Sequence, residues 1–537
     1  MNWNPVLPVL EQSRRTPDRL ALFADGVELS YGELARRAAR LAAALGEQGI
    51  GRGSRVGILG SRSLIAVEAV LGVAWCGATY VPLGLRWPED RINTVVSLTK
   101  LDALIADRSG AALLTADMLA NIRILALPAD APAEIPPGSA ERVVIRVDGH
   151  DGSESPHASA PFPEPAEMSA NDQVYVIFTS GTTGVPKGVM VASASLATYL
   201  AALGARKAMT PDDRASHFTE LSFDPSVGEI FLPLYVGASL HVLPALSTVS
   251  PARFIRDRQL TVWGSAPAAI AWLRDTRSLQ PGSLPTLRYS SFGGEPLPLA
   301  SVRAWQAAAP NSVVDNLYGP TEATVDCAGQ RVEPGATPVV TPERGVLAIG
   351  TPHPGSELAV FSPDRRPLPC GEVGELGIAG RQLAVGYFEA PGLTAERYPV
   401  IDGKRWFLTG DLAMQDAAGL FHHFGRLDNQ IKIHGHRVEL EEIEAHLRAV
   451  TQNDQVAAVA WPVVDGVALS IVAFVATCGI PPNKIREALR KRLPPHMVPS
   501  TIHELATLPL NTTGKLDRRA LIDRLQTRKP DDEALLG

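Results

Sequence analysis

Short apolar runs alternate along the chain with longer apolar segments of helical length. RVGILG (55–60) is a run typical of a buried strand, and TYVPL (79–83) is a second. The segment between them, SLIAVEAVLGVAWCG, has the length of a helix. The order recurs at QVYVIF (173–178), which ends in a glycine-rich loop and is followed by ASLATYLAAL, of helical composition. This alternation predicts an α/β fold.

The pattern changes near residues 425–430. Before this point GELGIAG, RWFLTGDL and GLFHHFGR read as short strands joined by turns, and after it VELEEIEAHLRAV begins an amphipathic helix. We therefore predict a large N-terminal domain over 1–427 and a small α+β domain over 428–537. The Gly-, Ser- and Pro-rich stretch 149–167 is expected to be an exposed loop and not a domain boundary.

Composition favours a soluble globular protein. With 537 residues the chain is too long for one ordinary core. Hydrophobic residues make up 45% and charged residues 20%, and 50 Lys plus Arg against 57 Asp plus Glu give a net charge of −7. This charge argues against nucleic-acid binding as the main function.

Location can also be predicted from the sequence. The four scattered cysteines lack zinc or redox spacing, so reduced thiols in the cytoplasm are expected. The N-terminus does not have the pattern of a secretory signal, and the sequence lacks a run of about 18 apolar residues, so we expect no membrane span.

The most informative local motif is the loop Phe178–Gly188, FTSGTTGVPKG. Glycines and small hydroxyl residues let a backbone approach phosphates closely, and Lys187 adds a positive charge. The Walker A loop is excluded, because that motif needs Gly before its lysine and Ser or Thr after it. Here Pro186 precedes Lys187 and Gly188 follows it.

This loop resembles the phosphate-binding loop of the adenylate-forming superfamily, which includes acyl-CoA synthetases, luciferases and the adenylation domains of nonribosomal peptide synthetases. The sequence is most similar to that of the peptide-synthetase adenylation domains. Further motifs occur in the family's order and spacing: LSYGEL (29–34), WCGATYVPL (75–83), NLYGPTEAT (316–324), TGDL (409–412), GRLDNQIKI (425–433) and NTTGKLD (511–517). Two positions depart from the usual pattern, Val385 and His434, where arginine is common.

The resemblance implies a large domain of stacked α/β sheets with a β-subdomain, and a small mobile α+β C-terminal domain. It also implies ATP and Mg²⁺. Tyr318 would provide a flat face for adenine, Asp411 would bind both ribose hydroxyls, and Thr321 would contact the α-phosphate. The nucleotide-binding set is Thr179, Ser180, Gly181, Thr182, Thr183, Gly184, Lys187, Gly293, Tyr318, Asp411, Arg426 and Lys515.

Catalysis is expected from three residues. Lys515 resembles the family's catalytic lysine, which would contact the substrate carboxylate and the α-phosphate; Thr321 and Glu322 complete the set. Glu322 and Thr183 would hold the metal ion, which screens phosphate charge. Asp428 is expected to be the hinge between two poses of the small domain.

Asp224, in the segment FDPS, matches the residue that binds the substrate amino group in amino-acid-activating members; helix capping is the alternative. Gly228 and Gly264 predict a roomy pocket, and Asp326 predicts a second carboxylate that needs an amine, guanidine or amide. A β-amino acid remains an alternative. The substrate-binding set is Asp224, Pro225, Gly228, Gly264, Ser291, Gly293, Leu317, Val325 and Asp326.

The predicted function is ATP-dependent activation of an amino acid to aminoacyl-AMP, followed by transfer to a phosphopantetheine thiol. No carrier domain is recognised in the sequence, so the thiol is expected on a separate carrier protein. Alternatives are an acyl-CoA ligase, a D-alanyl carrier-protein ligase and a nucleotide-binding regulatory protein without turnover. Asp224 argues against the first, and the presence of Lys515 and Glu322 argues against the last.

Overall fold

The computed structural model describes residues 2–129, 131, 135–136, 142–147, 163–181, 185–244, 250–433, 435–464, 467–510 and 516–527. The chain forms two compact units. The first comprises Met1–Leu85, Ile92–Thr179 and Lys187–Leu427; the second comprises Arg86–Arg91, Ser180–Pro186 and Asp428–Gly537. The two short segments interrupt the single 1–427 unit expected from the sequence, because they pack with the C-terminal residues.

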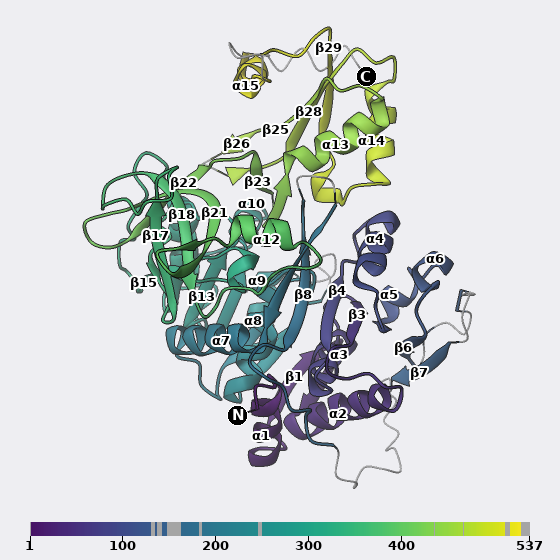
Figure 1. Cartoon of the computed structure of the whole chain (residues 1–537). Helices are drawn as coiled ribbons and strands as arrows, with labels where there is room; N and C mark the ends of the chain where they lie inside the picture. The colour runs from purple at the N-terminus through teal and green to yellow at the C-terminus, as the bar shows by residue number, and fades with distance from the viewer. Residues whose placement is uncertain are drawn as a thin grey trace. The chain divides into compact units, whose positions relative to one another are not determined.

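The first unit contains a long mixed sheet of strand order β16-β15-β14-β13-β12-β10-β11-β1-β2 (Figure 1). Its middle strands, from β1 to β14, run parallel, whereas β2, β15 and β16 pair antiparallel at the two ends. The strands are β1 (Leu20–Ala24), β2 (Val27–Ser30), β10 (Arg214–His217), β11 (Ser239–Val242), β12 (Val262–Ser265), β13 (Tyr289–Gly293), β14 (Val313–Tyr318), β15 (Ala328–Val332) and β16 (Thr351–Pro352).

A second sheet of the first unit has the order β19-β9-β8-β4-β3-β5-β6-β7. Continuous burial along β4 and β5 explains why β5 is apolar at every position and β4 at every position except Thr79. The strands are β3 (Arg55–Leu59), β4 (Thr79–Leu83), β5 (Ala103–Ala106), β6 (Ile124–Pro128), β7 (Val143–Val147), β8 (Gln173–Thr179), β9 (Lys187–Ala192) and β19 (Gly386–Tyr387).

A third, antiparallel sheet has the order β17-β18-β21-β20, with β22 paired to β21. It is the β-subdomain that the resemblance implies. Its long strand β21 carries the predicted ribose-binding Asp411. The strands are β17 (Ser356–Phe361), β18 (Gly374–Gly380), β20 (Val400–Ile401), β21 (Lys404–Gln415) and β22 (Phe421–Arg426).

Helices of the first unit pack on these sheets. Helix α2 begins with a capping box, in which Ser30 and Glu33 exchange side chain–backbone hydrogen bonds, and α3 is buried almost all round. The helices are α1 (Leu7–Arg15), α2 (Tyr31–Glu47), α3 (Leu64–Trp75), α5 (Arg108–Ala111), α6 (Ala116–Leu119), α7 (Ser193–Lys207), α8 (Pro225–Val236), α9 (Pro251–Asp257), α10 (Ala268–Asp275), α11 (Leu299–Ala308), the 3-10 helix η1 (Thr321–Ala323) and α12 (Pro391–Arg397).

The second unit has its own α+β core. Apolar residues of α13 and α14 pack on the sheet β25-β28-β29, and a second small sheet has the order β24-β23-β27-β26. The elements are β23 (Gln430–Ile433), β24 (His436–Glu439), α13 (Leu440–Thr451), β25 (Val456–Ala460), β26 (Val463–Val464), β27 (Val467–Ala468), β28 (Ile471–Ala476), α14 (Pro482–Arg490), η2 (Pro495–Met497), β29 (Thr501–Leu505) and α15 (Arg518–Thr527). Helix α4 (Glu89–Thr99) starts in this unit and continues in the first.

Candidate active site

The phosphate-loop motif spans the turn between β8 and β9. These strands pair antiparallel, with Thr179 opposite Lys187. The predicted cation Lys187 therefore lies at the end of the loop, where β9 begins. Ser180 and Gly181 belong to the second unit, where the Ser180 hydroxyl donates to the Arg437 carbonyl at 2.9 Å. Thr182, Thr183 and Gly184 lie outside the described residues, as does the predicted catalytic Lys515.

Three residues of the predicted nucleotide site meet at one carboxylate. Asp411 of β21 lies opposite Arg426 of β22, and the Arg426 guanidinium donates to it at 2.6 Å. The hydroxyl of Tyr318, at the end of β14, donates to the other carboxylate oxygen. Tyr318 and Asp411 are both buried, and burial followed by the charge of Asp411 raises the pKa of Tyr318 well above its usual value. Each carboxylate oxygen of Asp411 therefore has a protein donor.

His423 is a member of this cluster that the sequence did not reveal. Its Nε2 lies 3.5 Å from Asp411 Oδ1, and its ring centroid lies 6.3 Å from that of Tyr318. His423 and Arg426 are three residues apart on β22, so regular alternation would put them on opposite faces. A register shift between Leu412 and Ala413 lets both reach Asp411.

We expect Asp411→Asn to raise the KM for ATP by about 10-fold or more, because an amide neither carries charge nor accepts at both of its polar atoms. The KM for the second substrate should stay within about twofold. Asp364→Asn is the matched control, since Asp364 is exposed in a turn of the same unit. Initial rates of pyrophosphate exchange measure both constants. Equal changes in the two KM values would contradict a specific nucleotide role.

The predicted metal ligand Glu322 lies in η1 and is fully buried. The Tyr387 hydroxyl donates to its Oε1 at 2.7 Å, which orients the carboxylate. The described residues contain no group of three or more His, Cys, Asp or Glu side chains able to hold a metal. One carboxylate is nevertheless a suitable donor set for Mg²⁺, which is commonly bound by one or two carboxylates together with substrate phosphates.

The segment that follows η1 is held in an unusual conformation. Thr324 has φ +75°, and its hydroxyl donates to the Gln382 carbonyl at 2.5 Å. The Gln382 amide donates in turn to the carbonyls of Ala323 and Asp326. A Cβ at Gly319 would lie only 2.4 Å from the Asp326 backbone. Glycine and Gln382 thus fix where Val325 and Asp326 sit, and Gln382 was not identified from the sequence.

Asp224 precedes the first residue of α8 but does not cap it. Its side chain makes no capping hydrogen bond, which removes the evidence for the helix-cap interpretation. Asp224 is half-buried, and its charge acts on the buried hydroxyls of Tyr175 and Tyr199. Burial is the main cause of the raised pKa of each tyrosine, and Asp224 adds to it. Both tyrosines therefore lie close to the predicted ammonium-binding carboxylate.

Neighbouring strands place other predicted substrate residues side by side. Gly264 of β12 lies opposite Ser291 of β13, and Gly293 lies opposite Leu317 of β14. A Cβ at Gly264 would meet only ordinary contacts at 3.5 Å, so there is room at this glycine.

At Gly228 the prediction of a roomy pocket is wrong. A Cβ there would lie 2.3 Å from the Tyr199 hydroxyl. The absent side chain of Gly228 makes space for Tyr199, and that hydroxyl donates to Asp326 Oδ2 at 3.2 Å.

Asp326 is buried and only partly paired. His353 Nδ1 lies 3.3 Å from Asp326 Oδ1, yet neither atom has a hydrogen bond among the described residues. Burial lowers the pKa of His353 to about 4, so this histidine is neutral near pH 7. Burial raises the pKa of Asp326 to about 7, and the nearby Lys207 ammonium opposes that rise.

Lys207 is a positive charge near Asp326 that the sequence did not reveal. We expected a cation near Asp326 to come from the substrate, but Lys207 at the end of α7 already places a positive charge near it, without forming an ion pair. The requirement for a basic substrate therefore does not follow.

The chain resembles proteins of known family. A family model, "AMP-binding enzyme", matches residues 9–388. The chain belongs to the AMP-binding enzyme family. It is therefore an AMP-forming ligase, and the predicted family and enzyme class are confirmed.

Relatives of the AMP-binding chain include a novobiocin biosynthesis protein and a nonribosomal peptide synthase. It is 34% identical over 529 residues to "Novobiocin biosynthesis protein H" of Streptomyces niveus, covering 96% of this chain and 82% of that protein. It is also 34% identical over 519 residues to "Dimodular nonribosomal peptide synthase" of Bacillus subtilis, covering 95% of this chain. It spans only 20% of that synthase.

Solved adenylation domains share the fold. "Vibrio cholerae adenylation domain AlmE in complex with glycyl-adenosine-5'-phosphate" matches with a TM-score of 0.84 and 30% identity over 98% of each chain. An artificially fused adenylation–PCP di-domain, NpsA-ThdA from Klebsiella oxytoca, matches with a TM-score of 0.75 and 26% identity over 94% of each chain. The predicted α/β fold with a small C-terminal domain is confirmed.

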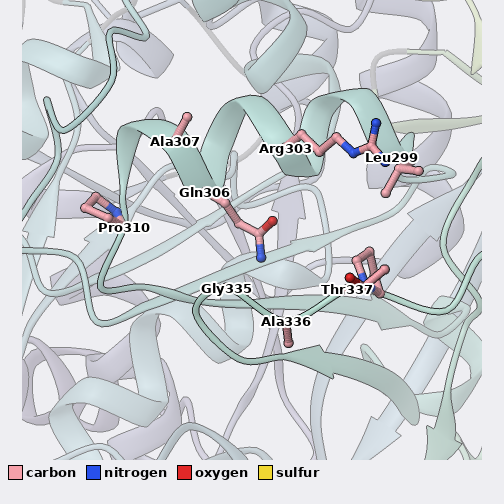
Figure 2. A pocket seen from close by; sticks show the side chains of 9 residues that line it. Leu299, Arg303, Gln306, Ala307, Pro310, Gly335, Ala336 and Thr337 are labelled. Carbon is pink, nitrogen blue, oxygen red and sulfur yellow. The ribbon is translucent and has the colours of Figure 1, made fainter.

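This AMP-binding enzyme also has a pocket outside the predicted site. A surface pocket lies beside α11 (Figure 2) and contains none of the predicted site residues; it is lined by Leu299, Arg303, Gln306, Ala307, Pro310, Gly335, Ala336, Thr337 and Pro338. Among the helices that the structure describes, none combines the length and the apolar character needed to cross a bilayer.

The raised pKa of Asp326 predicts a pH-dependent stability. The folded state holds a proton on Asp326 up to about pH 7, whereas the unfolded state loses it near pH 3.8. Ionisation therefore costs stability increasingly from pH 4 to pH 7 and by a constant amount above pH 7. Asp326→Asn removes this cost, so its stabilising effect should be larger at pH 8 than at pH 5.5, by up to about 2 kcal/mol.

Thermal unfolding of both proteins at the two pH values measures this difference. Asp275→Asn, an exposed aspartate at the end of α10, is the control that should show no pH-dependent gain. An equal shift of Tm for Asp326→Asn at both pH values would show that Asp326 titrates normally in the folded state.

Proposed function

We propose that this AMP-forming ligase activates an amino acid as aminoacyl-AMP and transfers it to the phosphopantetheine thiol of a separate carrier protein. The observation that carries the proposal is Asp224, a half-buried carboxylate at the start of α8 that makes no capping bond. A carboxylate in this position can bind an ammonium group through a charge-assisted contact. The glycyl-adenylate bound to the adenylation domain AlmE supports an amino-acid substrate.

In the first half-reaction, a carboxylate oxygen of the amino acid attacks the α-phosphorus of ATP. The bond to the β-phosphate oxygen breaks, and pyrophosphate leaves. Tyr318, Asp411 and Arg426 would hold the adenosine, and Lys515 would approach the α-phosphate as negative charge develops there. When bound at Glu322 and Thr183, Mg²⁺ would neutralise charge on the phosphate oxygens.

In the second half-reaction, the carrier thiolate attacks the acyl carbon, the mixed anhydride bond breaks and AMP leaves. The named adenylation–PCP fusion supports a carrier partner for this step. Asp428 is proposed as the hinge because it is the first residue of the C-terminal segment of the second unit. Hinge rotation would let a single substrate site run both half-reactions.

We expect Asp428→Pro to reduce thioester formation at least about 10-fold more than adenylation. Proline locks φ near −65° and so restricts a hinge. The two half-reactions are measured separately, by pyrophosphate exchange and by acylation of the carrier thiol. Asp454→Pro, in the exposed turn before β25, controls for a general effect of proline. Equal losses in both half-reactions would argue against Asp428 as the hinge.

The test of the function itself is an ATP–pyrophosphate exchange panel. Exchange should depend on amino acids and should not require coenzyme A, with fatty and aryl acids as controls. Coenzyme A-dependent thioester formation from acids without an amino group would instead identify an acyl-CoA ligase. Exchange with D-alanine alone would identify a D-alanyl carrier-protein ligase.

A further inference from the structure

Lys207 lies on the face of the sheet that carries the predicted substrate residues. It is the last residue of α7, which packs beside α8 (Figure 1). Its ammonium donates to the Ser291 hydroxyl at 3.3 Å and lies 5.6 Å from the centre of the Tyr289 ring. Ser291 is opposite Gly264, where there is room for additional atoms. The cation therefore stands next to the open position of the substrate site.

The backbone of Lys207 is fixed by its neighbours. The Arg288 guanidinium donates to the carbonyls of Lys207 and Ala208 at 3.0 and 3.1 Å, and its own charge is paired with Asp213. These contacts anchor the backbone from which the Lys207 side chain extends, and the hydrogen bond to Ser291 holds its ammonium.

The ammonium of Lys207 lacks enough acceptors. It has three N–H groups, and Ser291 is its hydrogen-bond acceptor among the described residues. The Ser291 hydroxyl gives its own proton to the Trp263 carbonyl, so its lone pairs are available to Lys207. No described carboxylate lies within ion-pair distance of Lys207. A half-buried ammonium with a single acceptor costs free energy unless a ligand supplies further acceptors.

The nearby carboxylates differ in what they can still bind. Glu229 already accepts four hydrogen bonds, from His217, from the backbone of Phe218 and from the backbone and hydroxyl of Thr219. Asp315 is paired with Arg206. Asp326 accepts only from Tyr199, and its Oδ1 has no hydrogen bond among the described residues. Asp326 is therefore the carboxylate with acceptor capacity left for a ligand.

We infer that Lys207 is a specificity-determining residue, and that the side chain of the substrate ends in a carboxamide or ureido group. This inference rests on the proposed amino-acid function. The carbonyl oxygen of such a group would accept from Lys207, and its N–H groups would donate to Asp326. A basic side chain would be repelled by Lys207, and an ionised acidic side chain would have no N–H group to donate to Asp326. Only a neutral group with both donor and acceptor satisfies the two residues together.

The test is a pyrophosphate-exchange panel with four classes of amino acid. Asparagine, glutamine and citrulline represent the neutral amide class; aspartate and glutamate, ornithine and lysine, and alanine and leucine represent the others. The wild-type protein should give a kcat/KM at least about 10-fold higher with one of the amide class than with any other. Lys207→Met should lower that value by about 10- to 100-fold, raise the relative value for ornithine, and leave the KM for ATP unchanged.

Lys404→Met is the matched control, because Lys404 is an exposed lysine paired with Glu357 on the third sheet. Thermal unfolding shows whether Lys207→Met folds. Ser291→Ala is a second variant at this site, and it should also lower kcat/KM for the preferred amide substrate. A wild-type preference for basic, acidic or apolar amino acids would overturn the inference, as would an unchanged profile in Lys207→Met. Exchange that occurs with fatty or aryl acids, and that none of the amino acids supports, would instead overturn the proposed function.

Discussion

Replacing Lys515 by alanine is expected to lower the rate of acyl-adenylate formation by about 10²–10³-fold, the usual cost of removing one charge-stabilising donor. The reason is electrostatic: negative charge builds on the α-phosphate during attack by another anion, and a fixed cation sheltered from water stabilises that state. The prediction rests on the motif NTTGKLD, because Lys515 lies outside the described residues.

Single-turnover formation of acyl-adenylate measures the effect without interference from product release. Lys484→Ala serves as the control, since Lys484 is an exposed lysine of the same unit, paired with Glu487. We expect the control to retain the wild-type rate. A Lys515→Ala protein that forms adenylate at the wild-type rate would refute the assigned catalytic role.

The second large effect is expected at Asp224. Asp224→Asn keeps the shape of the side chain but removes its charge, so the substrate ammonium loses a contact of about 1.5–3 kcal/mol. This corresponds to a decrease of about 10- to 100-fold in kcat/KM for the amino acid, with the KM for ATP unchanged.

A second readout separates recognition of the ammonium from general damage. The wild-type protein should strongly prefer an amino acid over the same acid without its amino group, and this preference should shrink in Asp224→Asn. Asp212→Asn controls for loss of an aspartate, because Asp212 is almost fully exposed in the same unit. If the preference were retained in full, Asp224 would not be the ammonium-binding residue.

Much of the fold was predictable from local pattern. TYVPL (79–83) coincides with β4, QVYVIF lies in β8, and SLIAVEAVLGVAWCG contains α3. These segments are buried on all sides, so their apolar character is a direct consequence of position. The C-terminal segment of the second unit starts at Asp428.

The missed site residues depend on tertiary contacts. Lys207 reads in sequence as a basic residue in the last turn of a helix, a common helix-end feature. Its ammonium reaches Ser291 and Tyr289 of β13 only in the folded chain, and local pattern does not encode that contact. Tyr199 likewise reads as a core residue of α7, although its hydroxyl binds Asp326. His423 reaches Asp411 because of a register shift between paired strands.

Direct detection of the acyl-adenylate by mass spectrometry tests the central claim most simply. The wild-type protein is incubated with ATP, Mg²⁺ and each acid of the panel, without coenzyme A or carrier protein. We predict a new species with the mass of an aminoacyl-AMP, formed from an amino acid and not from its counterpart that lacks the amino group. Adenylates formed only from acids without an amino group would contradict the account.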